Sequence, residues 1–77
     1  MKVRVLFFAY LRDRFGVGER VIEIQEGSLM RDLINHLKLS FPERETVRFA
    51  VNEEFSGEDR RLEKDDVIAL LPPVSGG

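Results

Sequence analysis

The stretch SLMRDLINHLKLSF, residues 28–41, carries the strongest periodic pattern in the chain and sets its fold class. Apolar side chains recur at every fourth position and two more widen the stripe, as on the buried face of an amphipathic helix. Ser28 is the predicted N-cap, and Pro42 disfavours helical geometry at Phe41, so the helix is expected to end between Leu39 and Phe41. The stripe comprises Leu29, Met30, Leu33, Ile34, Leu37 and Phe41.

Alternating apolar and polar residues on both sides of this helix predict strands. A short helical turn, ended by Gly16, is expected between the first two. The second face of the first strand becomes apolar toward its end, which fits either burial on both sides or a patch for a partner. Acidic clusters after the third strand are expected to form turns. The expected strands cover residues 2–9, 20–25, 47–51 and 67–71, the helical turn residues 10–15, and the later turns residues 52–54, 56–59 and 64–66.

The last strand has a continuous apolar run, VIALL, which favours a central position with both faces covered. Pro72 and Pro73 end it, because proline has no N–H to donate to a neighbouring strand. The order strand, strand, helix, strand, strand predicts a two-layer α+β domain. We therefore expect one domain over residues 1–77, with a mixed sheet of four to five strands covered by one main helix.

The amino-acid composition excludes several classes of function for this chain. The chain has 77 residues, with 43% hydrophobic and 34% charged residues, which is typical of folded domains. Its net charge of −2 makes nucleic acid a poor expected partner, and no apolar run is long enough to cross a membrane. Cysteine is absent, which excludes a thiol nucleophile or thiolate metal site and fits a reducing compartment. A cytoplasmic protein is expected.

The sequence ends on Gly76-Gly77, after Pro72-Pro73-Val74-Ser75. Gly77 has no Cβ, so a reacting group could approach its carbonyl carbon from either side. Residues 72–77, when extended, would reach about 18–21 Å. The alternative is a frayed chain end, where small residues are common. We expect a flexible Gly-Gly tail that presents its carboxylate.

Other candidate sites are weaker. His36 is the only histidine and falls on the polar face of the predicted helix, so a solvated side chain is expected. The acidic pairs lie in predicted turns, which argues against a metal site or a carboxylate pair for hydrolysis. Phe8, Tyr10 and Phe55 are candidates for a partner surface, because a core this small cannot bury every aromatic residue.

Three segments together resemble the small subunit of molybdopterin synthase, the MoaD family. They are VLFFA with Leu11-Arg12, AVN at residues 50–52, and Leu62 followed by DVIALLPPVSGG at residues 66–77. The resemblance covers essentially the whole chain and implies a β-grasp, ubiquitin-like fold. It also implies a sulfur carrier that is not catalytic alone.

In that family, an adenylating enzyme uses ATP to activate the terminal glycine carboxylate, and a sulfur source then leaves a thiocarboxylate. The large synthase subunit, with which a heterotetramer is expected, receives the tail and the sulfur passes to cyclic pyranopterin monophosphate. The resemblance implies no cofactor bound by the chain itself. It implies Gly77 and Gly76 as the reacting end, and as partner contacts Phe8, Arg12, Phe55, Leu71, Pro72, Pro73, Val74 and Ser75.

Alternatives remain open at this point. A carrier for thiamin or another thiolation pathway would share the glycine pair, and a ubiquitin-like protein modifier would use the same tail to form an isopeptide bond. For Phe8 and Leu71, core packing is as strong an expectation as partner contact.

Overall fold

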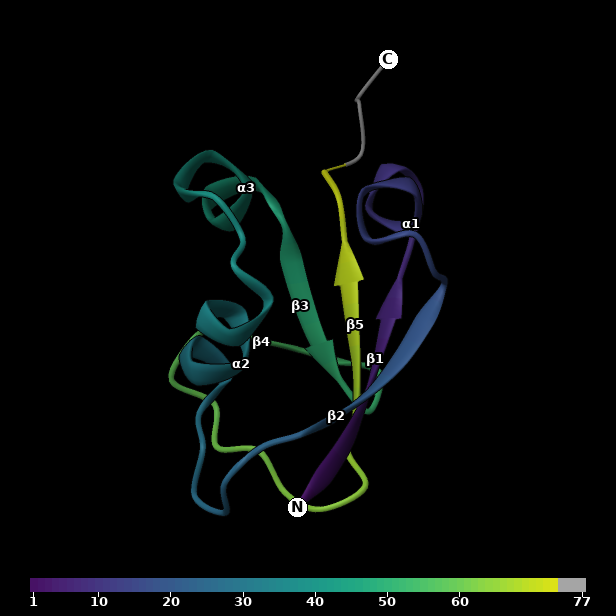
Figure 1. The fold of residues 1–77 in the computed structure, drawn as a ribbon. Coiled ribbons are helices and arrows are strands. Elements are labelled where there is room, and N and C mark those ends of the chain that lie inside the picture. Colours follow the sequence, from purple (N-terminus) through teal and green to yellow (C-terminus); the bar gives the residue numbers. More distant parts are fainter. Residues whose placement is uncertain (74–77) are drawn as a thin grey trace.

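The computed structural model describes residues 1–73, and they form a five-stranded mixed sheet in the order β2-β1-β5-β3-β4 (Figure 1). The strands are β1 (Lys2–Phe7), β2 (Glu19–Glu23), β3 (Arg48–Val51), β4 (Glu54–Ser56) and β5 (Val67–Leu71), and the helices are α1 (Tyr10–Phe15), α2 (Met30–Leu37) and α3 (Phe41–Thr46). The two central strands, β1 and β5, run parallel, and the other neighbours pair antiparallel. This arrangement confirms the predicted two-layer α+β fold.

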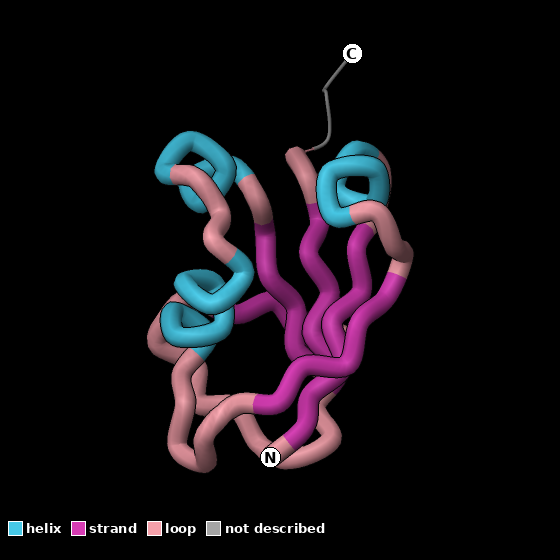
Figure 2. Tube along the Cα trace, in the orientation of Figure 1, coloured by secondary structure: helices cyan, strands magenta, loops and turns pink. Residues whose placement is uncertain are grey.

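Helix α2 lies beside the sheet (Figure 2), and the buried side chains of the core pack between α2 and one face of the sheet. Every second residue of β1 and β5 is buried there, because successive side chains of a strand point to opposite faces. From the helix come Met30, Leu33, Ile34 and Leu37, which confirms most of the predicted apolar stripe. Helices α1 and α3 lie toward the end of the sheet at which β5 stops (Figure 1).

The boundaries of α2 differ from the prediction at both ends. Leu29, not Ser28, is the N-cap: its backbone N–H donates to a carboxylate oxygen of Asp32 at 2.8 Å. The Ser28 hydroxyl instead donates to the carbonyl of Gln25 at 2.6 Å. The helix ends at Leu37, because Lys38 adopts a left-handed conformation with φ 58°. This turn lets Leu39 enter the core.

A second helix, α3, follows where the sequence predicted only the end of the first. Ser40 and Glu43 form a reciprocal capping box, in which the Glu43 N–H donates to the Ser40 hydroxyl and the Ser40 N–H donates to the Glu43 carboxylate. Pro42 sits in the first turn, where its missing N–H costs no hydrogen bond. Phe41 therefore begins α3 and is 73% exposed, so its assignment to the buried stripe was wrong.

The short strand β4 was also missed, because residues 54 and 56 were assigned to turns. Asn52 and Glu53 both have positive φ, 50° and 73°, and form a two-residue turn that folds β4 back on β3. The Asn52 side chain also joins β3 to β5, donating to Asp66 and accepting from the Val67 N–H. Within residues 1–73, every helix is too short or too polar to cross a bilayer.

Candidate functional site

Within residues 1–73, no helix packs against one face of the sheet, and we call this the outer face. On β1 and β5 the residues that alternate with the core side chains point there, and they are half-buried or exposed. The sequence correctly predicted a central β5, but the expectation that both its faces are covered was wrong for the described residues. The outer-face residues of the two central strands are Lys2, Arg4, Leu6, Val67, Ala69 and Leu71.

Strand register places an apolar row across the outer face. Phe55 of β4 lies opposite Ala50 of β3, Ala50 lies opposite Ala69 of β5, and Ala69 lies opposite Leu6 of β1. The two alanines are small, so the middle of the row is lower than its ends. On one side of the row is a shallow hollow lined by Leu6, Phe8, Asn52, Glu53, Val67 and Ala69.

A second hollow lies at the base of the tail. Leu71, the last residue of β5, is in register with Arg48, and β5 gives way to Pro72 and Pro73 immediately afterwards. The hollow is lined by Arg48, Phe55, Leu71, Pro72 and Pro73. The outer face is therefore continuous with the start of the tail. Any protein that receives the tail would meet this apolar surface on the way.

The structure brings together most of the apolar partner contacts that the resemblance implied. Phe8 is 38% exposed in the first hollow, whereas its neighbour Phe7 is fully buried in the core. Phe55 is 65% exposed, and Leu71 is half-buried beside it. Of the two interpretations left open for Phe8 and Leu71, a place on the accessible outer face fits the structure better than core packing.

Two groups of predicted site residues are not part of this arrangement. Arg12, on α1, lines neither hollow; a Cβ added to Gly18 would come within 3.2 Å of its Nε atom, so its side chain lies along the turn before β2. Four predicted site residues lie outside the described part of the chain: the predicted reacting end, Gly76 and Gly77, and the predicted partner contacts Val74 and Ser75.

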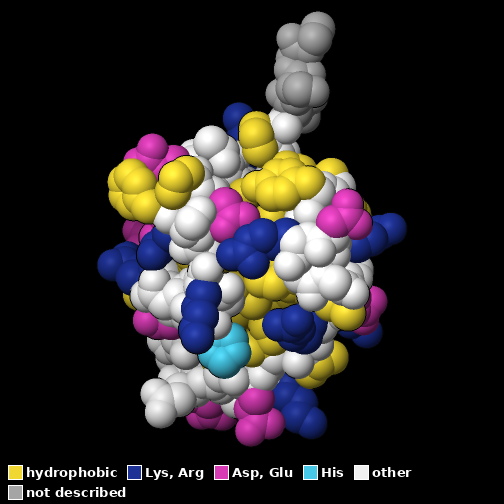
Figure 3. All heavy atoms as spheres, turned by 45° about the horizontal axis from the view of Figure 1, so that its top comes forward, with side chains coloured by type: hydrophobic (Ala, Val, Ile, Leu, Met, Phe, Trp, Pro, Cys, Tyr) yellow, Lys and Arg dark blue, Asp and Glu magenta, His cyan; other side chains and the backbone are white. Residues whose placement is uncertain are grey.

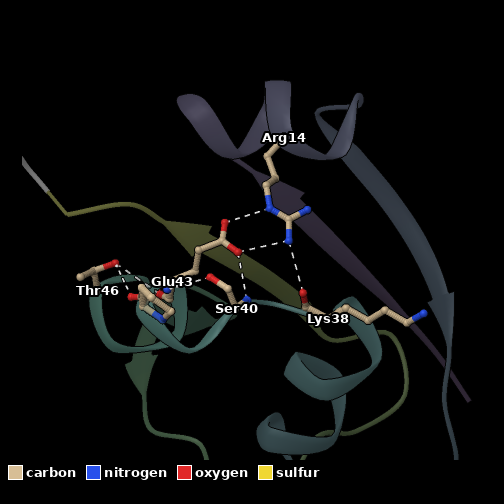
Figure 4. Close-up of polar contacts among 6 residues, drawn as sticks. Arg14, Lys38, Ser40, Glu43 and Thr46 are labelled. Atoms are coloured by element: carbon tan, nitrogen blue, oxygen red, sulfur yellow. Dashed lines mark hydrogen bonds and ion pairs between the residues drawn. The ribbon is translucent and has the colours of Figure 1, made fainter.

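A polar brace connects the helices near the base of the tail (Figure 4). The guanidinium of Arg14 on α1 donates two hydrogen bonds to the carboxylate of Glu43 on α3, at 3.0 and 3.1 Å. It also donates to the carbonyl of Lys38, just after α2, at 3.3 Å. A single arginine thus connects all three helices. Burial raises the pKa of Glu43, but hydrogen bonds from the Ser40 backbone, Arg14 and the Ser40 side chain, with the charge of Arg14, hold that pKa below its ordinary value.

The lowered pKa of Glu43 predicts that the free energy of unfolding depends on pH in the acid range. Because the folded-state pKa of Glu43 is lowered, its ionised form stabilises the fold above about pH 4.5, and this contribution is lost as pH falls through the folded-state pKa. We expect Glu43→Gln to lower the free energy of unfolding at neutral pH by about 1 kcal/mol, and to flatten its decline in acid. Urea unfolding of both proteins, at neutral pH and at a series of acidic pH values, measures both effects.

Glu45→Gln is the matched control, since Glu45 is on the same helix and makes no ion pair with another described residue. It should leave the acid branch of the stability curve unchanged. Equal acid slopes for wild type and Glu43→Gln would show that Glu43 contributes nothing to the pH dependence.

The described part of the chain offers few other candidate functional sites. The helix-side surface mixes both signs of charge without a large patch of either (Figure 3). His36 borders an open hollow that also includes Glu23, Glu26 and Asp32. Among residues 1–73, however, no three His, Cys, Asp or Glu side chains are placed to hold a metal ion.

Sequence reasoning missed Arg48 and the row through Ala50 and Ala69. The signal for the row was present in VIALL, where alternate residues were taken as buried against a second layer. Arg48 gave no signal, because one arginine at a strand end is ordinary. Its position beside Leu71 and Phe55 becomes known only from the strand register.

Comparison with known proteins places this geometry in a family. The sequence matches the ThiS family over residues 5–77. It is 35% identical to the molybdopterin synthase sulfur carrier subunit of Chlamydomonas reinhardtii, over the full length of both chains. The structure resembles a putative molybdopterin converting factor subunit 1 from Pyrococcus furiosus, with 34% identity and a TM-score of 0.84, covering 96% of this chain and 99% of that one.

A structure of a complex between subunits 1 and 2 of the molybdopterin-converting factor from Helicobacter pylori also contains a similar chain. The identity is 27% and the TM-score 0.71, over the whole of both chains. These likenesses confirm the β-grasp fold and the resemblance found in the sequence. The chain belongs to the ThiS family, with molybdopterin synthase sulfur carrier subunits among its relatives.

Proposed function

We propose that this chain carries sulfur for molybdopterin synthesis on the carboxyl group of Gly77. The observation that supports this most strongly is the 35% sequence identity, over the full length of both chains, to a protein named molybdopterin synthase sulfur carrier subunit. The outer face adds a physical reason, since its apolar surface leads directly to the base of the tail. Apolar patches of this kind commonly mark a surface for another protein.

In the proposed reaction, the carrier needs no catalytic group of its own. A carboxylate is a poor electrophile, so a partner enzyme uses ATP to convert it into an acyl-adenylate, which has a good leaving group. A sulfur source then displaces the adenylate and leaves a thiocarboxylate, a ready nucleophile. This chain supplies the reacting end and a surface by which each partner positions it. Catalytic groups belong to the partners.

The proposed acceptor is cyclic pyranopterin monophosphate, held by a large synthase subunit. The complex of two subunits from Helicobacter pylori supports a partner of this kind. In our proposal, the large subunit covers the outer face around Phe8, Phe55 and Leu71. Pro72 and Pro73 then direct the tail toward its active site, and proline reduces the conformational entropy that the tail loses on entering.

Intact mass spectrometry of the protein purified from its own cells tests the carrier role. We expect a fraction of the protein to be heavier by the replacement of one oxygen with sulfur, located on Gly77 by fragmentation. Reconstitution with the large subunit and the pterin precursor should then give molybdopterin. Adducts on lysines of other proteins, without the sulfur form, would favour a protein modifier. Transfer to a thiazole product alone would favour the thiamin pathway.

A further inference from the structure

Among the described residues that line the hollow at the base of the tail, Arg48 has the only charged side chain. It begins β3, points to the outer face like Ala50 two residues later, and is in register with Leu71. Its guanidinium carbon lies 5.8 Å from the centre of the Phe55 ring, within the range of a cation–π contact. The side chain therefore lies over the Phe55 ring on the apolar surface.

The charge of Arg48 is not neutralised by another described residue. Within residues 1–73, the ion pairs of arginine are Arg4 with Glu19, Arg14 with Glu43 and Arg44 with Glu58. Arg48 is exposed and takes part in none of them. Its guanidinium thus offers hydrogen-bond donors to the solvent on the same face that displays Phe55 and Leu71.

A protein that covers this hollow must also cover the guanidinium. Removing an arginine from water without an acceptor is strongly unfavourable, whereas a carboxylate that accepts two parallel hydrogen bonds compensates for the lost hydration. The guanidinium is planar and already lies beside the Phe55 ring, so less conformational freedom is lost on pairing than for a flexible lysine. An apolar partner surface without a carboxylate at this position would be disfavoured.

We propose that Arg48 determines partner specificity: the protein that receives the tail places an Asp or Glu side chain against the Arg48 guanidinium, beside an apolar contact with Phe55 and Leu71. This inference rests on the proposed function, since it concerns the large subunit. It adds the chemistry by which that partner is distinguished from other proteins with an apolar docking surface.

Binding of the large subunit from the same organism, measured by calorimetry, tests this proposal. Arg48→Ala should weaken binding about 30-fold or more, as expected when one member of a covered charge pair is removed. Arg48→Glu should weaken it further, because two carboxylates would then face each other. Arg48→Lys should recover part of the loss. The salt dependence of binding should be smaller for Arg48→Ala than for wild type.

Arg60→Glu is the matched control, because Arg60 is exposed and lines neither outer-face hollow. This substitution changes the net charge by the same amount as Arg48→Glu. It should alter binding by less than about threefold, the scale of a rim charge. Wild-type melting temperatures for the Arg48 variants would show that the fold is intact. Should Arg48→Glu not fold, Arg48→Ala carries the test.

The outcomes separate the two proposals. If wild type binds the large subunit and both Arg48→Ala and Arg48→Glu bind equally well, the role of Arg48 is refuted and the carrier function stands. Equal weakening by Arg48→Glu and Arg60→Glu would also refute it, since only overall charge would matter. If wild type neither binds the large subunit nor carries sulfur in cells, the proposed function itself fails.

Discussion

Deletion of Gly77 is expected to abolish sulfur transfer while leaving the fold unchanged. Among the described residues, the core cluster ends at Leu70, seven positions before Gly77, so we expect the melting temperature to match that of wild type. The shortened tail still ends in a carboxylate, on Gly76, but that carboxylate lies about 3.5 Å short of the position where each partner acts. Effective catalysis requires reacting atoms to be aligned within a few tenths of an ångström, so this displacement should reduce transfer by a factor of at least about 100.

Gly77→Ala is the informative companion, because it keeps the length and the carboxylate and adds only a Cβ. We expect it to be adenylated but to transfer sulfur poorly, because the added Cβ would crowd the approach of a reacting group to the terminal carbonyl carbon in the partner's active site. Single-turnover assays of acyl-adenylate and of molybdopterin separate these steps. Full sulfur transfer by the deletion variant would contradict the mechanism at the terminal carboxylate.

Phe7 and Phe8 are adjacent, and we expect opposite results when each is replaced. Phe7 is fully buried and stacks on Phe15 with 4.4 Å between ring centres, so Phe7→Ala should cost about 3–5 kcal/mol of unfolding free energy. In a domain of this size, that corresponds to a melting temperature lower by at least about 12 °C. Phe8→Asp should change stability by less than about 1 kcal/mol, yet weaken binding to the large subunit at least 30-fold.

Phe41→Asp provides the control for Phe8→Asp. Phe41 is 73% exposed on α3 and lines neither outer-face hollow, so this substitution should leave both stability and binding near wild type. Thermal unfolding and calorimetric titration measure the two quantities on each variant. A large loss of stability in Phe8→Asp would assign Phe8 to the core, and unchanged binding would remove it from the partner surface.

Local pattern was enough to predict the elements that carry a strong signal. The bounds of β5 were predicted to the residue, because its apolar run stops at two prolines. The bounds of α1 were equally accurate, since Gly16 takes the left-handed conformation that ends it, with φ 79°. The prediction for β1 ran two residues too long, because Ala9 turns the chain toward α1 with φ 52°.

The missed elements are short and depend on their neighbours. With three residues, β4 is too short for its alternation to stand out, and its existence follows from the turn at Asn52 and Glu53. For α3 the sequence holds one signal, the capping box of Ser40 and Glu43, but Pro42 beside it is equally typical of a helix end. Proline ends a helix at one position and starts one at another, and the preceding residues decide which.

By itself, the sequence determined the α+β class, the single main core helix, the absence of cysteine chemistry and a Gly-Gly end, because these depend on residue identity and short-range periodicity. Only the tertiary structure decided that Phe8, Phe55 and Leu71 lie on one open face, and that Arg48 lies among them. The physical reason is register: a shift of one residue in strand pairing would turn each of these side chains to the opposite face. Pairing across the sheet is a long-range property that no local pattern contains.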